Sequence, residues 1–243
     1  REELGRLFVS SAAIIAVSET IKHLLLELGA PEDKIALDSG GVDTKLFHGG
    51  DPGAAPPIFL AVGRLVDKKA PHLTLLAFSR VLEHCPHAKM MLVGDGPLKG
   101  VVRDMVRALG LEGHVELMGA VQHEEVLRLM QQVRGFVQHS VTACDGNIEG
   151  LPTTVMEASA VGLPIVATCH SGISEAVVHG RTGYLVKEHD TEGMARHLVE
   201  LAQYPSLAAK LGQAARGYML DNYSQEASLR IVTGVIESAI QGR

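Results

Sequence analysis

Between residues 58 and 186, short apolar runs rich in β-branched residues alternate with longer stretches whose apolar residues recur at helical spacing. This alternation is typical of a parallel sheet whose two faces are both covered by helices. We therefore predict an α/β fold with a doubly wound, Rossmann-like parallel sheet of about six strands. The predicted strands are Ile58 to Val62, Lys89 to Val93, Val115 to Met118, Gly135 to Gln138, Pro164 to Thr168 and Gly183 to Val186.

The helices predicted between these strands are Pro71 to Glu83, Leu98 to Leu109, Glu124 to Gln131, Pro152 to Val161 and Ser174 to Val178. In open parallel sheets, ligands bind beyond the carboxyl ends of the strands. The loops after Val62, Met118, Gln138 and Thr168 are therefore expected to share one crevice.

The two ends of the sequence do not follow the alternation. Residues 1–47 predict only a strand, a helix and a second strand, at Ser11 to Val17, Glu19 to Leu28 and Lys34 to Leu37. This is too little for an independent core, so we interpret residues 1–47 as the remnant of an N-terminal lobe that lies mostly outside this sequence. A Gly- and Pro-rich linker at residues 48–57 precedes a binding lobe at residues 58–223, and residues 224–243 form a C-terminal helix packing back toward the N-terminal lobe.

The composition disfavours several classes of function. A net charge of -6 and a pI of about 6.1 provide no basic surface for nucleic acid. The 3 cysteines form no CxxC and the 12 histidines no metal-binding motif, so we predict neither disulfides nor a metal site. No apolar run approaches the ~18 residues of a membrane span. The cysteines fit a reducing cytosol, although a targeting signal stays open because the sequence starts at Arg1.

Two glutamates flank a predicted helix start. Glu149 precedes the helix and Glu157 lies inside it, so we expect their carboxylates roughly 8 to 12 Å apart. Pro152 is expected as the first helical residue, because its missing N–H would be unpaired there. The free N–H groups of Gly150 and Leu151, with the helix dipole behind them, suit a phosphate. This geometry fits a nucleotide sugar, with the sugar at one glutamate and a ribose diol at the other.

A second charged segment follows the first strand of the sheet. Arg64 and Lys69 lie at a carboxyl end, where a guanidinium and an ammonium group would hold a diphosphate. Lys68 is interpreted as a solvated residue, and a plain surface loop remains the alternative for the whole segment. Glu149 could be an ordinary loop residue, and Glu157 could cap a neighbouring helix or pair with an arginine.

Three other functions are disfavoured by the spacing of motifs. The Gly-Asp-Gly after Val93 resembles a dinucleotide fingerprint, but Lys99 occupies the position of its third glycine. A glycosidase needs carboxyls about 5 Å apart, or about 6.5 to 9.5 Å apart across one bond, so the estimated separation disfavours a retaining one more than an inverting one. Ser140 lacks the GxSxG elbow of a hydrolase.

Taken in order, the motifs resemble those of the retaining glycosyltransferases of family 4, whose two Rossmann-like lobes form the B-type glycosyltransferase fold. The matching segments are Ile14 to Glu19, Gly41 to Asp43, Gly63 to Val66, Val93 to Pro97, Glu149 to Pro152, Glu157 to Ala158, Gly162 to Pro164 and Gly180 to Val186. By this resemblance the chain is the C-terminal, donor-binding lobe. Ala70 departs from the family, which usually has glycine there.

The resemblance also implies a role for each candidate residue. Arg64 and Lys69, following Gly63, hold the donor diphosphate without a metal and stabilise it as it leaves, so that these two cations and Glu149 are the candidate catalytic residues. Glu149 contacts the sugar, and Glu157 binds the ribose hydroxyls. Backbone groups that meet sugar, phosphate or base belong to Val121, Gly150, Leu151, Pro152 and Thr153.

The implied reaction transfers a sugar, with retention, from a nucleoside-diphosphate sugar to a hydroxyl of a saccharide or lipid-linked acceptor, in polysaccharide or glycolipid synthesis. No cofactor is implied, and a UDP-sugar is favoured over a GDP-sugar. The acceptor site and any peripheral membrane contact belong to the N-terminal lobe, so the fragment is expected to bind donor without robust transfer, in the cytoplasm or at the inner face of the membrane. A non-catalytic nucleotide-sugar-binding module with a partner chain and a sugar-nucleotide epimerase stay open as alternatives.

Overall fold

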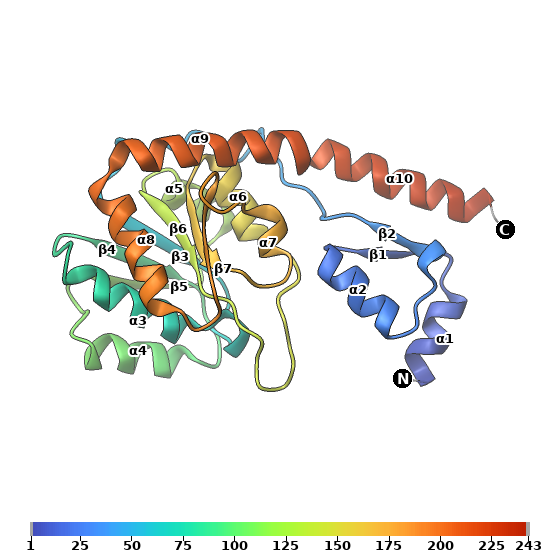
Figure 1. The fold of residues 1–243 in the computed structure, drawn as a ribbon, viewed down its shortest axis with the longest axis horizontal. Coiled ribbons are helices and arrows are strands. Elements are labelled where there is room, and N and C mark those ends of the chain that lie inside the picture. Colours follow the sequence, from blue (N-terminus) through green and yellow to red (C-terminus); the bar gives the residue numbers. More distant parts are fainter. Residues whose placement is uncertain (1, 242–243) are drawn as a thin grey trace.

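The computed structural model describes residues 2–241 and contains two separate parallel sheets (Figure 1). The larger sheet has 6 strands in the order β5-β4-β3-β6-β7-β8. Its strands are β3 (Ile58–Val62), β4 (Lys89–Val93), β5 (Val115–Gly119), β6 (Gly135–Gln138), β7 (Ile165–Thr168) and β8 (Gly183–Val186). The predicted α/β fold with a six-stranded parallel sheet is confirmed, and each predicted strand is correct to within 1 residue at either end.

The order of strands reverses between β3 and β6. From β3 the chain moves outward through β4 to β5, then returns to pair β6 with the free side of β3 and continues outward to β8. The loops that leave β3 and β6 therefore diverge toward opposite faces and open a crevice at the carboxyl edge of the sheet. Both charged segments predicted from the sequence lie on these two loops.

Helices cover both faces of the large sheet. They are α3 (Pro71–Leu82), α4 (Lys99–Ala108), α5 (His123–Met130), α6 (Thr153–Val161), α7 (Ile173–Ala176), α8 (Thr191–Gln203) and α9 (Pro205–Asn222). One face forms a core with α3, α4 and α8 around Phe59 and Phe78, and the other with α5, α6 and α7 around Phe136 and Met156. All 4 residues of β6 and all 4 of β7 are buried, as expected for central strands covered on both sides.

The predicted start of α6 is wrong by one residue. Pro152 has φ −71° and ψ 121°, which is an extended conformation, so it precedes the helix and Thr153 is the first helical residue. Gly162 ends this helix as predicted, with a left-handed φ of 101° that favours glycine.

The N-terminal residues contain a helix that the sequence did not predict. Helix α1 (Glu2–Ser10) extends to the N–H of Ser11, which donates to the carbonyl of Leu7 over 2.9 Å. The strand predicted at Ser11 to Val17 is therefore shorter than expected and begins only at Ile14. The remaining elements of this part are β1 (Ile14–Ala16), α2 (Glu19–Glu27), the 3-10 helix η1 (Glu32–Lys34) and β2 (Ile35–Leu37).

The smaller sheet pairs β1 with β2, apart from the larger sheet, and lies beside α10 (Gln225–Gln241) in Figure 1. Val42 joins the two parts of the molecule: its N–H donates to the carbonyl of Tyr223 over 2.8 Å, and its carbonyl accepts the N–H of Gln225 over 3.1 Å. Ser228 of α10 adds a hydrogen bond of 2.9 Å to Asp38. Among residues 2–241, no helix is both long and apolar enough to cross a membrane.

Candidate functional site

A cleft opens at the carboxyl ends of β3, β4 and β6, next to the reversal of strand order. It is lined by Ala61, Val62, Gly63, Arg64, Leu65, Lys69, Pro71, Thr74, Leu92, Val93, Val137 and Gln138. Of the four loops expected at one crevice, those after Val62 and Gln138 begin in this lining. The loop after Thr168 carries His170, which accepts the N–H of Glu149, and the loop after Met118 leads into α5, whose first residue His123 contacts Glu157.

The turn that carries Arg64 depends on close contact with the turn that follows β4. A Cβ on Gly94 would lie 1.9 Å from the carbonyl oxygen of Gly63, and a Cβ on Gly96 would lie 2.5 Å from that of Leu65. Any other residue would force the two turns apart, so glycine is required at both positions. The glycines that resembled a dinucleotide motif therefore shape the turn of Arg64.

Arg64 is exposed, and within residues 2–241 its guanidinium has no hydrogen-bond or ion-pair partner. Burial lowers the pKa of the nearby Lys69 ammonium below its ordinary value, Glu149 opposes that effect, and the charges of Lys68 and Arg64 lower it further. The two predicted cations thus lie close enough to repel each other. A free guanidinium beside a largely buried ammonium suits an anion with more than one negative charge.

Lys69 and Glu149, which are 80 residues apart, meet directly. The distance from Lys69 Nζ to Glu149 Oε2 is 2.7 Å, and the two side chains are only 16% and 13% exposed. Lys69 ends the 3-10 helix η2 (Asp67–Lys69), and Ala70 then takes a left-handed φ of 37° before α3 begins. For a residue other than glycine this conformation costs roughly 1–2 kcal/mol, so the chain accepts strain at the position where the family usually has glycine.

Lys68 is not the solvated residue that the sequence suggested. Its side chain is 18% exposed, and its ammonium donates to the carbonyl of Ile148 over 2.9 Å. The carbonyl of Lys68 also accepts the N–H of Val141 over 2.9 Å. Lys68 therefore holds the loop after β3 against both ends of the loop after β6, a contact that no local pattern in the sequence could predict.

Unpaired hydrogen-bonding groups gather around Glu149. Its Oε2 atom is buried and forms an ion pair of 2.7 Å with the Lys69 ammonium. Helix α6 has no side-chain cap at its N-terminus. Within residues 2–241, the backbone N–H groups of Gly150, Leu151, Thr153 and Thr154 also have no hydrogen-bond partner. Unpaired backbone donors beside the Glu149 carboxylate fit a ligand that carries a phosphate and hydroxyls.

Glu157 lies on α6 with its side chain 13% exposed, so the predicted partial burial is correct. Its partner is His123 rather than an arginine, with 3.1 Å between Nε2 and Oε1. The His123 ring also packs against Phe47, at 5.2 Å between centroids. Val121, predicted to touch a base, lies two residues before His123 and packs partly buried against the core.

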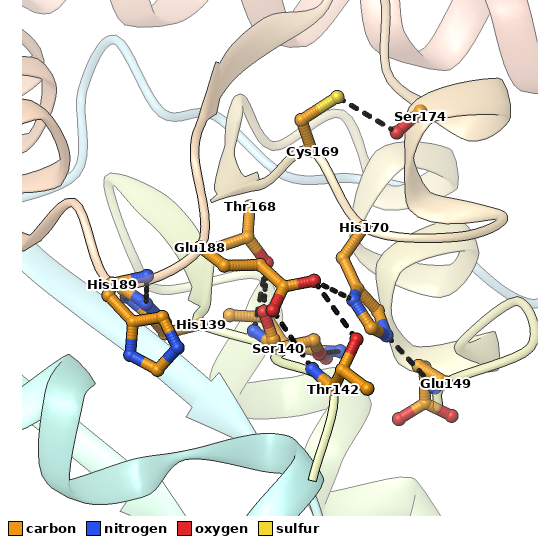
Figure 2. Close-up of polar contacts among 11 residues, drawn as sticks. His139, Ser140, Thr142, Glu149, Thr168, Cys169, His170, Ser174, Glu188 and His189 are labelled. Carbon is orange, nitrogen blue, oxygen red and sulfur yellow. Dashed lines mark hydrogen bonds and ion pairs between the residues drawn. The ribbon is translucent and has the colours of Figure 1, made fainter. Parts of the chain in front are cut away.

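Two further loops meet the Glu149 loop behind Glu149 (Figure 2). His170, after β7, lies with Nδ1 2.6 Å from Oε1 of Glu188, after β8, and its side chain is 3% exposed. The N–H of Glu149 donates to His170 Nε2 over 3.0 Å, and that of Thr142 donates to Glu188 Oε2 over 3.0 Å. Burial raises the pKa of Glu188, but the hydrogen bonds from His170 and Thr142 outweigh it, so the pKa lies below its ordinary value.

His139 is a second histidine buried beneath the site. Its Nε2 accepts the N–H of His189 over 3.0 Å, whereas Nδ1 is buried without a partner in the described residues. Burial, followed by the charges of His189 and His72, lowers the pKa of His139 to about 4. His123, His170 and Glu188 could not be recognised from the sequence, because none belongs to a motif with a recognisable spacing.

Comparison with known proteins identifies the family. The family model described as Glycosyl transferases group 1 matches residues 47–218, more than half of the 243 residues. This chain belongs to the group 1 glycosyltransferases. The family predicted from the motifs is thereby confirmed.

Two relatives illustrate the range of the family. The amylovoran biosynthesis glycosyltransferase AmsK of Erwinia amylovora is 29% identical over 239 residues, which cover 98% of this chain and 59% of AmsK. A GDP-mannose-dependent alpha-(1-6)-phosphatidylinositol monomannoside mannosyltransferase of Mycolicibacterium smegmatis is 30% identical over 195 residues, which cover 75% of this chain and 51% of the relative. The chain thus spans little more than half the length of these relatives.

The structural comparison supports the same fold. The crystal structure of Anabaena HepE in complex with UDP and glucose superposes with a TM-score of 0.82, over 94% of this chain and 64% of HepE. The sequences are 19% identical in that superposition, so the likeness shows the fold alone. The predicted B-type glycosyltransferase fold is confirmed by such structures.

Proposed function

We propose that this group 1 chain is the donor-binding lobe of a retaining glycosyltransferase, which passes a sugar from a nucleoside-diphosphate sugar to a hydroxyl of a saccharide or lipid-linked acceptor. The observation that carries the proposal is the contact between Lys69 and Glu149 beside the unpartnered Arg64. These three charged groups, from two loops, lie at the edge where the strand order reverses, which is where open α/β sheets bind ligands.

The diphosphate is proposed to bind between the cations and the N-terminus of α6. Arg64 offers a two-pronged donor, Lys69 a point charge, and the free backbone N–H groups after Glu149 further donors. Each charge-assisted hydrogen bond contributes about 1.5–3 kcal/mol. Negative charge grows on the diphosphate as the sugar leaves, so the same cations would stabilise the transition state more than the bound donor, which is the requirement for catalysis.

The sugar and the nucleoside are proposed to lie on either side of the diphosphate. The Glu149 carboxylate would accept a sugar hydroxyl, and Glu157 would accept the ribose diol, in competition with His123. The base would meet the backbone at Val121. UDP remains our preferred nucleotide, and HepE, which was crystallised with UDP and glucose, supports it. The GDP-mannose-dependent relative keeps GDP as the alternative.

The acceptor is proposed to bind to a further lobe. Residues 2–47 contribute a separate two-stranded sheet, and α10 extends from α9 alongside it, consistent with their belonging to that lobe (Figure 1). AmsK is longer than this chain and is named for amylovoran biosynthesis, which supports a role in polysaccharide synthesis. On this proposal the enzyme works in the cytoplasm, with any membrane contact made by the other lobe, and the present chain alone transfers little sugar.

Isothermal titration of the chain with UDP, GDP, ADP and UDP-glucose tests donor binding, and uridine serves as a phosphate-free control. We expect a nucleoside diphosphate to bind more tightly than its nucleoside. Arg64→Ala should weaken diphosphate binding about 10- to 150-fold, because one charge-assisted bond is lost, and should leave uridine binding unchanged.

Arg107→Ala is the matched control, because this exposed arginine lies in the last turn of α4, toward the opposite edge of the sheet. It should leave every affinity unchanged. The proposal fails if the wild-type chain binds no nucleoside diphosphate, or if Arg64→Ala binds UDP as tightly as the wild type. Product analysis of the full-length protein then separates sugar transfer from epimerisation.

A further inference from the structure

The loop that carries Glu149 is held by a histidine in one defined tautomer. The N–H of Glu149 can only donate, so the His170 Nε2 atom 3.0 Å away must accept and carries no proton. The proton of the neutral ring therefore lies on Nδ1, which donates to Glu188 Oε1 over 2.6 Å. Because the His170 side chain is 3% exposed, little water competes for either bond.

Glu188 uses both carboxylate oxygens to connect two loops. Oε1 accepts from His170, and Oε2 accepts the N–H of Thr142 over 3.0 Å. Thr142 lies near the start of the loop after β6, and Glu149 lies near its end. A single carboxylate on the loop after β8 thus fixes one end of the Glu149 loop directly and the other end through an imidazole (Figure 2).

Each backbone group next to Glu149 is bound to a different loop. The carbonyl of Ile148 accepts from Lys68 over 2.9 Å, and the carbonyl of Gly150 accepts the N–H of Gly172 over 2.9 Å. A Cβ on Gly172 would lie 2.5 Å from that same carbonyl, so the approach is close. The peptide of Glu149 is the one that depends on His170, which leaves the carboxylate free to face Lys69.

We propose that His170 and Glu188 are positioning residues of the donor site: Glu188 fixes the His170 tautomer, and His170 in turn fixes the Glu149 backbone so that its carboxylate meets the sugar. The inference rests on the proposed function of this site. Neither residue contacts Arg64 or the free N–H groups of α6, so the pair acts only through the loop. Buried hydrogen-bonded groups behind a site commonly orient the residues that contact the ligand.

Glu188→Gln distinguishes this role from simple packing, because the side chains have the same shape. The amide has one acceptor and one donor end, whereas Thr142 N–H and His170 Nδ1–H both need an acceptor. If the amide nitrogen faces His170, the ring must move its proton to Nε2, where it opposes the N–H of Glu149. If the amide nitrogen faces Thr142 instead, its N–H group lies opposite the N–H of Thr142, and neither donor has an acceptor.

Three measurements on the wild type and Glu188→Gln test the inference, with Glu192→Gln, an exposed glutamate nearby, as the control. Long-range proton–nitrogen correlation spectra, assigned with His170→Gln, should show His170 protonated on Nδ1 in the wild type. In Glu188→Gln they should show the proton on Nε2 if the amide nitrogen faces His170, and on Nδ1 if it faces Thr142. Backbone hydrogen exchange should be at least about 10-fold faster in residues 142–151 of Glu188→Gln and unchanged elsewhere. UDP-glucose affinity should fall about 10-fold, as expected for the loss of about 1.4 kcal/mol.

The outcomes separate this inference from the proposed function. If wild-type His170 carries its proton on Nε2, or exchange in residues 142–151 of Glu188→Gln equals that of the wild type, the positioning role is refuted. It is also refuted if the loop loosens but UDP-glucose affinity stays the same. If the wild type binds no nucleotide at all, the proposed function fails, while the tautomer and the exchange rates still decide whether the pair fixes the loop.

Discussion

His139 should make the fold sensitive to mild acid. It is fully buried at the end of β6, and burial is the main cause that lowers its pKa to about 4. In the unfolded chain the imidazole returns to its ordinary pKa of 6.5. Between pH 6.5 and about 4 the unfolded chain therefore binds a proton that the folded chain does not, so stability falls as the pH falls through this window.

The size of the effect follows from the difference in pKa. Each unit of pKa shift corresponds to about 1.4 kcal/mol, so the whole window represents about 3 kcal/mol. Between pH 7 and pH 5 the expected loss from this one group is about 2 kcal/mol. That is a large share of the about 5–15 kcal/mol that stabilises a typical domain.

Urea unfolding at pH 7 and pH 5, followed by circular dichroism, measures this loss in the wild type and in His139→Gln. The glutamine amide oxygen can still accept the N–H of His189, but it does not titrate. His72 and His197, whose pKa values are also lowered by burial, are present in both proteins and cancel in the difference. The reasoning is refuted if His139→Gln loses as much stability between the two pH values as the wild type.

Two further predictions concern the charged groups of the site. In a double-mutant cycle of Lys69→Met and Glu149→Gln, urea unfolding should give a coupling of about 1–3 kcal/mol, since the pair is more buried than a surface ion pair but not fully enclosed. Additive effects would mean that the contact is energetically irrelevant. Glu157→Gln should lower calorimetric affinity for UDP about 10-fold but change the affinity for 2′-deoxy-UDP less, because a ribose hydroxyl loses its charged acceptor. If Glu157→Gln lowers the affinities for UDP and 2′-deoxy-UDP equally, the role of Glu157 is instead to hold His123 in place.

The elements of the large sheet could be predicted because their signals are local. Strands β6 and β7 are short, mostly apolar runs without polar alternation, as expected for central strands, and Gly162 ends α6 in a left-handed conformation that favours glycine. The positions of Arg64 and Glu149 could be predicted from the same local signals, because these signals define the strands that precede them. Once each was assigned to a loop after a parallel strand, the geometry of the sheet brought both to one edge.

The contacts that hold the site together could not be predicted, because they join loops that are distant in the sequence. Lys68 looked like a solvated neighbour of Lys69, and only the fold brings it to Ile148. His170 and Glu188 are 18 residues apart on separate loops, with no motif between them. Helix α1 was missed for another reason: it has 9 residues, Leu4 and Leu7 stay partly exposed, and such a short amphipathic segment gives little signal.

Because the strand order reverses at the site, different parts of a bound ligand would contact different strands of the sheet. These contacts differ in how easily they can be replaced. The cations and Glu149 follow β3 and β6, two interior strands, where an insertion would disturb the packing of both faces. Val121 and His123 follow β5, an edge strand that pairs with a neighbour on one side only. On the proposed function, changes at this edge of the sheet could alter the nucleobase preference from one relative to another. The residues that bind the pyrophosphate, in the middle of the sheet, would stay the same.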